Sequence, residues 1–208
     1  MNLQSILNQV LNSVQNNTPA GGRSPSPLNG LGGGMLTAGI LSMLMKKKST
    51  KSLAKAGSVA ALGMLAYQAY QSWQRNSRPQ AAAPAADQFA HNQADGEAHS
   101  RVILKTMIAA AASDGLIDAQ ERAMIEQEAV QYPQEQQWLA QEFNRPASAA
   151  EVAAAVGGRP ALAAEAYLAA RMVCDELSRK EIVFLSQLSQ ALNLDDQLVD
   201  ALEKQAGF

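Results

Sequence analysis

Five carboxylates stand on two short turns between helical patterns, and they are the side chains of this sequence best suited to chemistry. The first turn contains Asp114, Asp118 and Glu121, and the second contains Asp175 and Glu181. Carboxylate oxygens that lie close together suit a hard divalent cation such as Ca²⁺, Mg²⁺ or Mn²⁺. These five residues are therefore candidate ligands of a metal site.

Helix capping gives a second interpretation of the same residues. Asp118 and Glu121 have the three-residue spacing of a capping box, and Ser178 and Glu181 repeat it. Gly115 supplies the positive φ that ends a helix. Capping alone, and capping combined with weak cation binding, both remain open.

The elements that carry these turns are predicted to be helices, because residues 99–208 show no strand-like alternation. The predicted helices cover about 99–113, 118–131 and 134–143, a short helix ending at Gly157, and longer ones at 160–173 and 178–193, with a last one from Asp195. The second turn resembles the first, although it is about one residue shorter and lacks the glycine. We therefore expect an all-α bundle of two related helix–acidic turn–helix halves.

The N-terminal residues 1–27 are predicted to form an amphipathic helix followed by a flexible linker. The apolar residues fall at helical spacing, namely Leu3, Ile6, Leu7, Val10, Leu11 and Val14. The opposite face is polar and uncharged, so the stripe suits either self-association or contact with a membrane surface.

Residues 28–75 are predicted to be a Gly/Ala-rich membrane region. Residues 28–45 are uncharged and end at three lysines, and the run 53–73 contains one charge. Its 21 residues would reach about 31 Å as a helix, the thickness of a bilayer core. Two soluble helices remain the alternative, and the number of membrane spans stays open. Residues 76–98 are an Ala/Pro-rich linker before a domain at 99–208.

Charge divides the chain at Asp87. The residues before it include eight of the 17 Lys and Arg and none of the 19 Asp and Glu. Such a split favours two parts with different partners. The basic residues are few and lie between apolar runs, which argues against nucleic-acid binding and for contact with membrane lipid.

Signals of catalysis are lacking in the sequence. The single cysteine, Cys174, lies in an apolar run, and neither His91 nor His99 stands near a nucleophile in sequence. Cys174 is expected to be buried and inert, and no catalytic residue is assigned.

The layout resembles the YebE family of bacterial inner-membrane proteins. The resemblance rests on the motif Ala-Ala-Ser-Asp-Gly-x-Ile-Asp-x-x-Glu-Arg at residues 111–122. Residues 99–206 also resemble the TerB-like fold, an all-α bundle of two related halves. That resemblance implies divalent-cation binding by the acidic turns, and it implies a location at the inner membrane.

Together these observations predict a non-enzymatic, membrane-anchored protein. Its acidic domain, expected on the cytoplasmic side, would bind a protein partner. That partner is either another protein or a second copy of this chain. The alternative is a TerB-like module that binds a divalent cation or senses stress.

Overall fold

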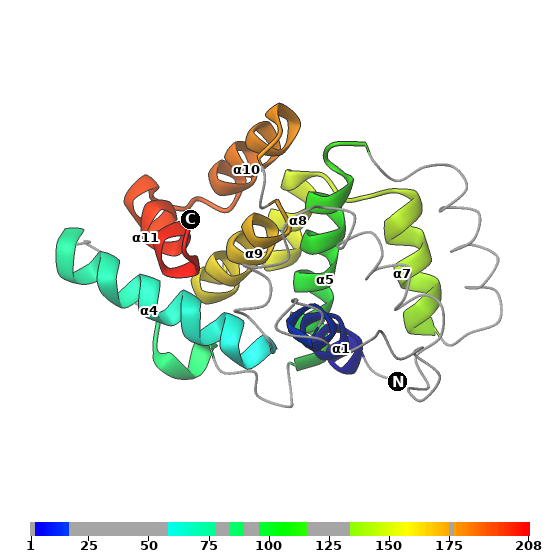
Figure 1. Ribbon diagram of the computed structural model, residues 1–208, viewed down its shortest axis with the longest axis horizontal. Helices are drawn as coiled ribbons and strands as arrows, with labels where there is room; N and C mark the ends of the chain where they lie inside the picture. Colours follow the sequence, from blue (N-terminus) through cyan, green and yellow to red (C-terminus); the bar gives the residue numbers. More distant parts are fainter. Residues whose placement is uncertain (1–2, 17–57, 78–83, 90–95, 116–133, 175–176) are drawn as a thin grey trace, which may run out of the picture.

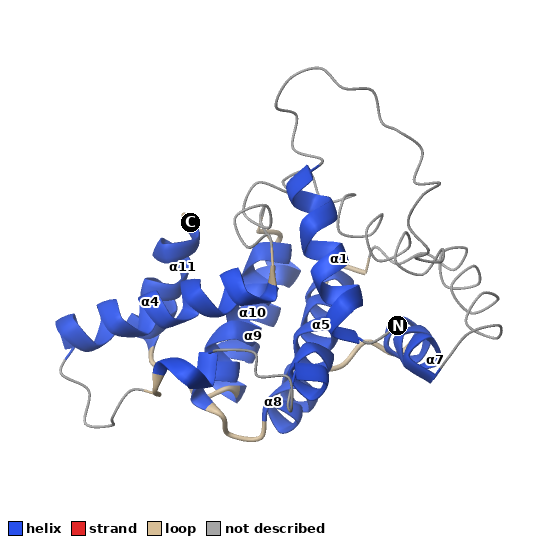
Figure 2. Ribbon diagram, turned by 90° about the horizontal axis from the view of Figure 1, so that it is seen from below, coloured by secondary structure: helices blue, strands red, loops and turns tan. Residues whose placement is uncertain are grey.

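Helices make up all the regular secondary structure in the part of the chain that the structure describes (Figure 2). This computed structural model describes residues 3–16, 58–77, 84–89, 96–115, 134–174 and 177–208. The all-α prediction is therefore confirmed for these residues. The predicted helix at 118–131 lies outside them, so the relation between the two halves stays a prediction.

The C-terminal helices agree closely with the predicted ones (Figure 1). They are α5 (Gly96–Ala112), α7 (Gln134–Asn144), α8 (Ala149–Val156), α9 (Pro160–Val173), α10 (Arg179–Ala191) and α11 (Asp196–Ala206). Local sequence explains these ends. Ser148 and Ser178 each form a capping box with the glutamate three residues later. Pro160 occupies the first turn of α9, where its missing N–H costs no hydrogen bond.

Helix α9 is the centre of the bundle. All of its residues from Ala161 to Val173 are buried, and it contacts α4, α5, α8, α10 and α11. Many of these residues are alanines, and those of α5 at 109–111 are buried as well. Small side chains allow two helix backbones to approach closely, which explains why an alanine-rich helix can lie at the core of this protein.

The N-terminal helix α1 (Leu3–Asn16) packs on α5 and on α4 (Val59–Ser77). Its apolar residues Leu3, Ile6, Leu7, Val10 and Leu11 are each at most 2 % exposed. The backbone N–H of Leu3 donates to Glu97 Oε1 at 2.7 Å. The predicted amphipathic helix is therefore confirmed, and its apolar stripe is part of the core of this chain.

Helix α4 falls in the region predicted to enter a membrane, but it too is part of the bundle. Its buried face consists of Val59, Leu62, Ala66, Ala69 and Tyr70. It contacts α9 and α11 along this face, and a short 3₁₀ helix, η1 (Ala86–Phe89), covers its middle. Figure 1 shows α4 and α11 side by side.

The second predicted membrane segment, residues 53–73, is not confirmed. None of the helices in the described ranges combines the length and the apolar character that a bilayer crossing requires. The segment is apolar in sequence because α4 buries a wide stripe against α9 and α11. From the sequence alone, such a stripe cannot be distinguished from a lipid-facing surface. Residues 28–57, which contain the first predicted segment, lie outside the described residues. The predicted domain boundaries stay predictions.

Candidate functional site

The first acidic turn follows α5, and the structure describes it as far as Gly115. That glycine has φ +83°, the left-handed conformation predicted for a residue that ends a helix. The backbone carbonyl of Asp114 accepts a hydrogen bond from Lys180 Nζ at 3.2 Å. Asp118 and Glu121 lie outside the described residues.

The second acidic turn precedes α10, and its glutamate is part of the helix cap. Glu181 is 2 % exposed, and its Oε2 accepts from the backbone N–H of Ser178 at 2.8 Å. In return, Ser178 Oγ accepts from the N–H of Glu181 at 3.3 Å. The predicted capping box is thus present, while Asp175 lies outside the described residues.

Lys180 brings the two turns together in space, since it links α10 to the end of α5. In the described part of the chain, His, Cys, Asp and Glu form no group of three that could hold a metal ion. Because three of the five predicted ligands lie outside the described residues, the cation site stays a prediction. Of the two that are described, Glu181 serves the cap and Asp114 has a lysine beside it.

Beside these turns the structure exposes an apolar surface that sequence analysis missed. Leu177 is 42 % exposed, Ile182 50 % and Val183 54 %, and we call these three residues the α10 patch. A signal was available in the sequence. Ile182 and Val183 are followed by two further apolar residues, and four consecutive residues cannot all face one side of a helix.

The exposed charges that helix α10 itself places next to the α10 patch are basic. Helix α10 contains three charged residues, of which Arg179 and Lys180 are exposed and Glu181 is buried. The sequence indicated a domain in which acids outnumber bases. Burial of the one acid leaves the exposed face of α10 positively charged beside its apolar side chains. Figure 1 shows α10 (orange) at the edge of the molecule.

The buried polar groups of the core lie apart from this surface. His99 and Glu165 are in contact between α5 and α9, with 2.7 Å from His99 Nε2 to Glu165 Oε2. No partner for His99 was found in sequence because Glu165 is 66 residues away. Cys174 is fully buried, as predicted, with its Sγ 3.8 Å from the carbonyl oxygen of Ala110.

Comparison with known protein families gives a match over most of the chain. The model of a family described as "Protein of unknown function (DUF533)" matches residues 30–206. No curated protein and no solved structure matches this chain. The family match covers α4 and all the helices that follow it, including the α10 patch.

Proposed function

We propose a protein-interaction role for this chain, which belongs to the DUF533 family of proteins of unknown function. Without catalysing a reaction, the chain would bind an acidic amphipathic helix of a partner protein on the α10 patch. The observation that carries the proposal is the exposure of Leu177, Ile182 and Val183 beside two basic residues.

Burial of the α10 patch supplies the binding energy. Complete burial of a Leu, Ile or Val side chain is worth about 1.5–3 kcal/mol, and these three are about half exposed. Covering the remaining halves would therefore contribute on the order of 1 kcal/mol for each side chain. A partner helix can present apolar residues three and four positions apart to such a surface.

Charge selects the partner. Arg179 and Lys180 are exposed at the start of α10, and the acid that follows them is buried. Carboxylates on the partner helix would pair with these bases at the rim of the contact. Exposed pairs of this kind contribute little affinity, but they steer association and are sensitive to salt.

We further propose that the chain contacts a membrane surface peripherally. Helices α1 and α4 belong to one bundle, so the residues between them begin and end on the same side of any membrane. A single crossing by residues 28–45 does not meet this condition. Two crossings need about 40 apolar residues. The uncharged run 28–45 is too short for this, and the three lysines that follow it prevent a longer apolar stretch.

Lys46, Lys47 and Lys48 would bind anionic lipid beside the apolar run, and they favour the cytoplasmic face. The resemblance to the bacterial inner-membrane YebE family and to the TerB-like fold supports this location. Membership of the DUF533 family is compatible with both resemblances.

Photocrosslinking tests the interaction. A photoreactive amino acid replaces Val183 in the full-length chain, and crosslinked peptides are mapped by mass spectrometry. We expect crosslinks to an acidic, amphipathic segment of another protein. Arg179→Glu, at an exposed position, should lower the yield about fivefold, because it reverses one charge at the rim.

The matched control carries the same amino acid at Ala154, an exposed position of α8. Equal crosslinking from Ala154 and Val183 would overturn the proposal. So would crosslinks confined to this chain or to a second copy of it, because the α10 patch would then be an internal or self-association surface.

A further inference from the structure

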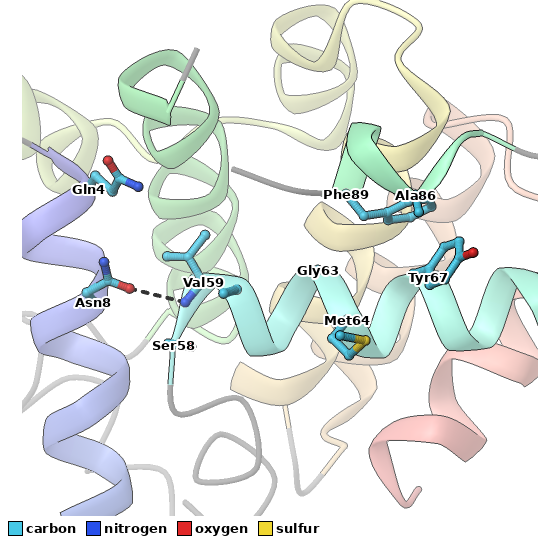
Figure 3. Close-up of a pocket in the computed structure, with 10 residues that line it drawn as sticks. Gln4, Asn8, Ser58, Val59, Gly63, Met64, Tyr67, Ala86 and Phe89 are labelled. Atoms are coloured by element: carbon cyan, nitrogen blue, oxygen red, sulfur yellow. Dashed lines mark hydrogen bonds between the residues drawn. The ribbon is translucent and has the colours of Figure 1, made fainter. Parts of the chain in front are cut away.

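A cleft opens between α1, α4 and η1, on a part of the molecule remote in sequence from the α10 patch (Figure 3). Its volume is about 640 Å³, which lies within the roughly 300–1,000 Å³ typical of small-molecule sites. Figure 3 shows α4 running along the cleft, with α1 at one end and η1 above the middle.

The walls of the cleft are apolar. Tyr67 of α4 and Phe89 of η1 pack with ring centroids 5.5 Å apart. Met64 stands at the rim with 57 % of its surface exposed, and its flexible thioether adapts to different shapes. Gly63 also lines the cleft and contributes only backbone atoms to its wall.

One end of the cleft is polar. Gln4 and Asn8 lie four residues apart on α1, so their carboxamides share one face of that helix. Asn8 Oδ1 accepts from the backbone N–H of Val59 at 3.2 Å, which fixes the orientation of the amide. The NH₂ group of Asn8 is left as the donor at this end, and it suits a carbonyl or hydroxyl oxygen.

The described part of the cleft lining contains no charged side chain. The described residues that line it are Gln4, Asn8, Ser58, Val59, Ala60, Gly63, Met64, Tyr67, Ala86 and Phe89, and none is ionisable near neutral pH. A carboxylate or phosphate group would lose hydration on entering such a site without gaining an ion pair. The cleft therefore favours a neutral ligand over a charged one.

We propose that the cleft binds a single neutral acyl chain, linked to its head group by an ester or amide. The chain lies along α4 over Gly63 and Met64, and the carbonyl oxygen accepts from the carboxamide of Gln4 or Asn8. From Val59 to Tyr67 the helix rises roughly 12 Å, which sets the length of chain in contact with the wall. This ligand is independent of the protein partner proposed for the α10 patch.

Titration of the full-length chain with 1-monolauroylglycerol, below its micelle concentration, tests this assignment. We expect saturable binding at one site. Ala60→Leu fills the cleft from an exposed helix position, so the variant should fold and should bind at least about tenfold more weakly. Gln4→Ala should weaken binding about three- to tenfold, the effect of one hydrogen bond.

The matched control is Ala154→Leu, the same substitution at an exposed position of α8 outside the cleft. Circular dichroism melts check that each variant is folded. The proposal is overturned if Ala60→Leu and Ala154→Leu bind equally well, or if laurate binds more tightly than the neutral ester. Absence of saturable binding overturns it too.

A second copy of the chain could also occupy the cleft. Analytical sedimentation of the ligand-free chain distinguishes this occupant from the acyl ligand. A monomer that is unchanged by Ala60→Leu supports the acyl ligand. A dimer that dissociates in this variant assigns the cleft to self-association and overturns the proposal.

Discussion

At the scale of single residues, the fold engages the carboxylate of Glu181 and the backbone carbonyl of Asp114. Glu181 closes the capping box of α10 from a buried position. The Asp114 carbonyl receives Lys180, so an ammonium group stands 3.2 Å from its oxygen. A cation bound at this turn would be repelled by Lys180, by about 2 kcal/mol for a divalent ion roughly 4 Å away even in bulk water.

We therefore expect calorimetry to show no saturable binding of Ca²⁺, Mg²⁺ or Mn²⁺ by the full-length chain at about millimolar concentration, a weak affinity for a protein site. Lys180→Met removes the repulsion and would reveal any site that the lysine suppresses. Asp200→Asn, at an exposed position of α11, is the control for Asp114→Asn. Binding by the natural chain that is lost only in Asp114→Asn would establish the cation site and contradict this expectation.

At the scale of elements, α1 and α4 show why an apolar stripe does not identify its own partner. The stripe of α1 suits a membrane, a second copy or a bundle equally well, because each of these removes the stripe from water. The polar contacts of α1 show that its partner in this structure is the bundle. Leu3 pairs with Glu97 of α5, and Asn8 accepts from Val59 at the start of α4. These hydrogen bonds hold α1 in one position on the bundle.

Leu7→Ala tests the packing of α1. Leu7 is fully buried, so the substitution should lower the free energy of unfolding by about 2–5 kcal/mol, the cost of a core cavity. Urea unfolding followed by circular dichroism measures the change. Met64→Ala, at an exposed apolar position, should cost less than about 1 kcal/mol. Equal effects of the two substitutions would show that α1 is not part of the core.

At the scale of the whole molecule, α11 depends on both α4 and α9. Arg171 of α9 is 5 % exposed, with its Nε 3.2 Å from Glu203 Oε1 and its guanidinium 3.6 Å from the centroid of the Phe208 ring. Tyr167 donates to the same glutamate oxygen at 2.8 Å, and burial raises the pKa of Tyr167 above its usual value. Trp73 of α4 donates to Asp195, the N-cap of α11, at 3.2 Å.

Removal of residues 1–95 should therefore destabilise the C-terminal helices. The truncation uncovers the faces of α9 and α11 that contact α4, and the newly exposed apolar surface favours association. We expect a lower melting temperature and a concentration-dependent aggregate by light scattering. If residues 96–208 melt at the temperature of the full-length chain as a monomer, they form an independent domain, and α4 adds little to their stability.

Local signals account for the part of the fold that was predicted. The capping box at Ser178 and the positive φ of Gly115 are found as expected. Ser148 and Pro160 act in the same local way, through residues at most three or four positions away. The candidate site was predicted less well. The carboxylate spacing indicated the turns, but the exposure of the α10 patch and the position of the cleft depend on how elements distant in sequence pack together.

The sequence by itself determined that this protein is helical, where its C-terminal helices begin and end, and that Cys174 is buried. These properties follow from backbone hydrogen bonding and from short-range periodicity, which are encoded within a few residues. Only the tertiary structure decided that α1 and α4 pack on the bundle, that His99 meets Glu165, and that Ile182 and Val183 face solvent. Burial depends on which surfaces come together, and a stripe of apolar residues is compatible with many such surfaces.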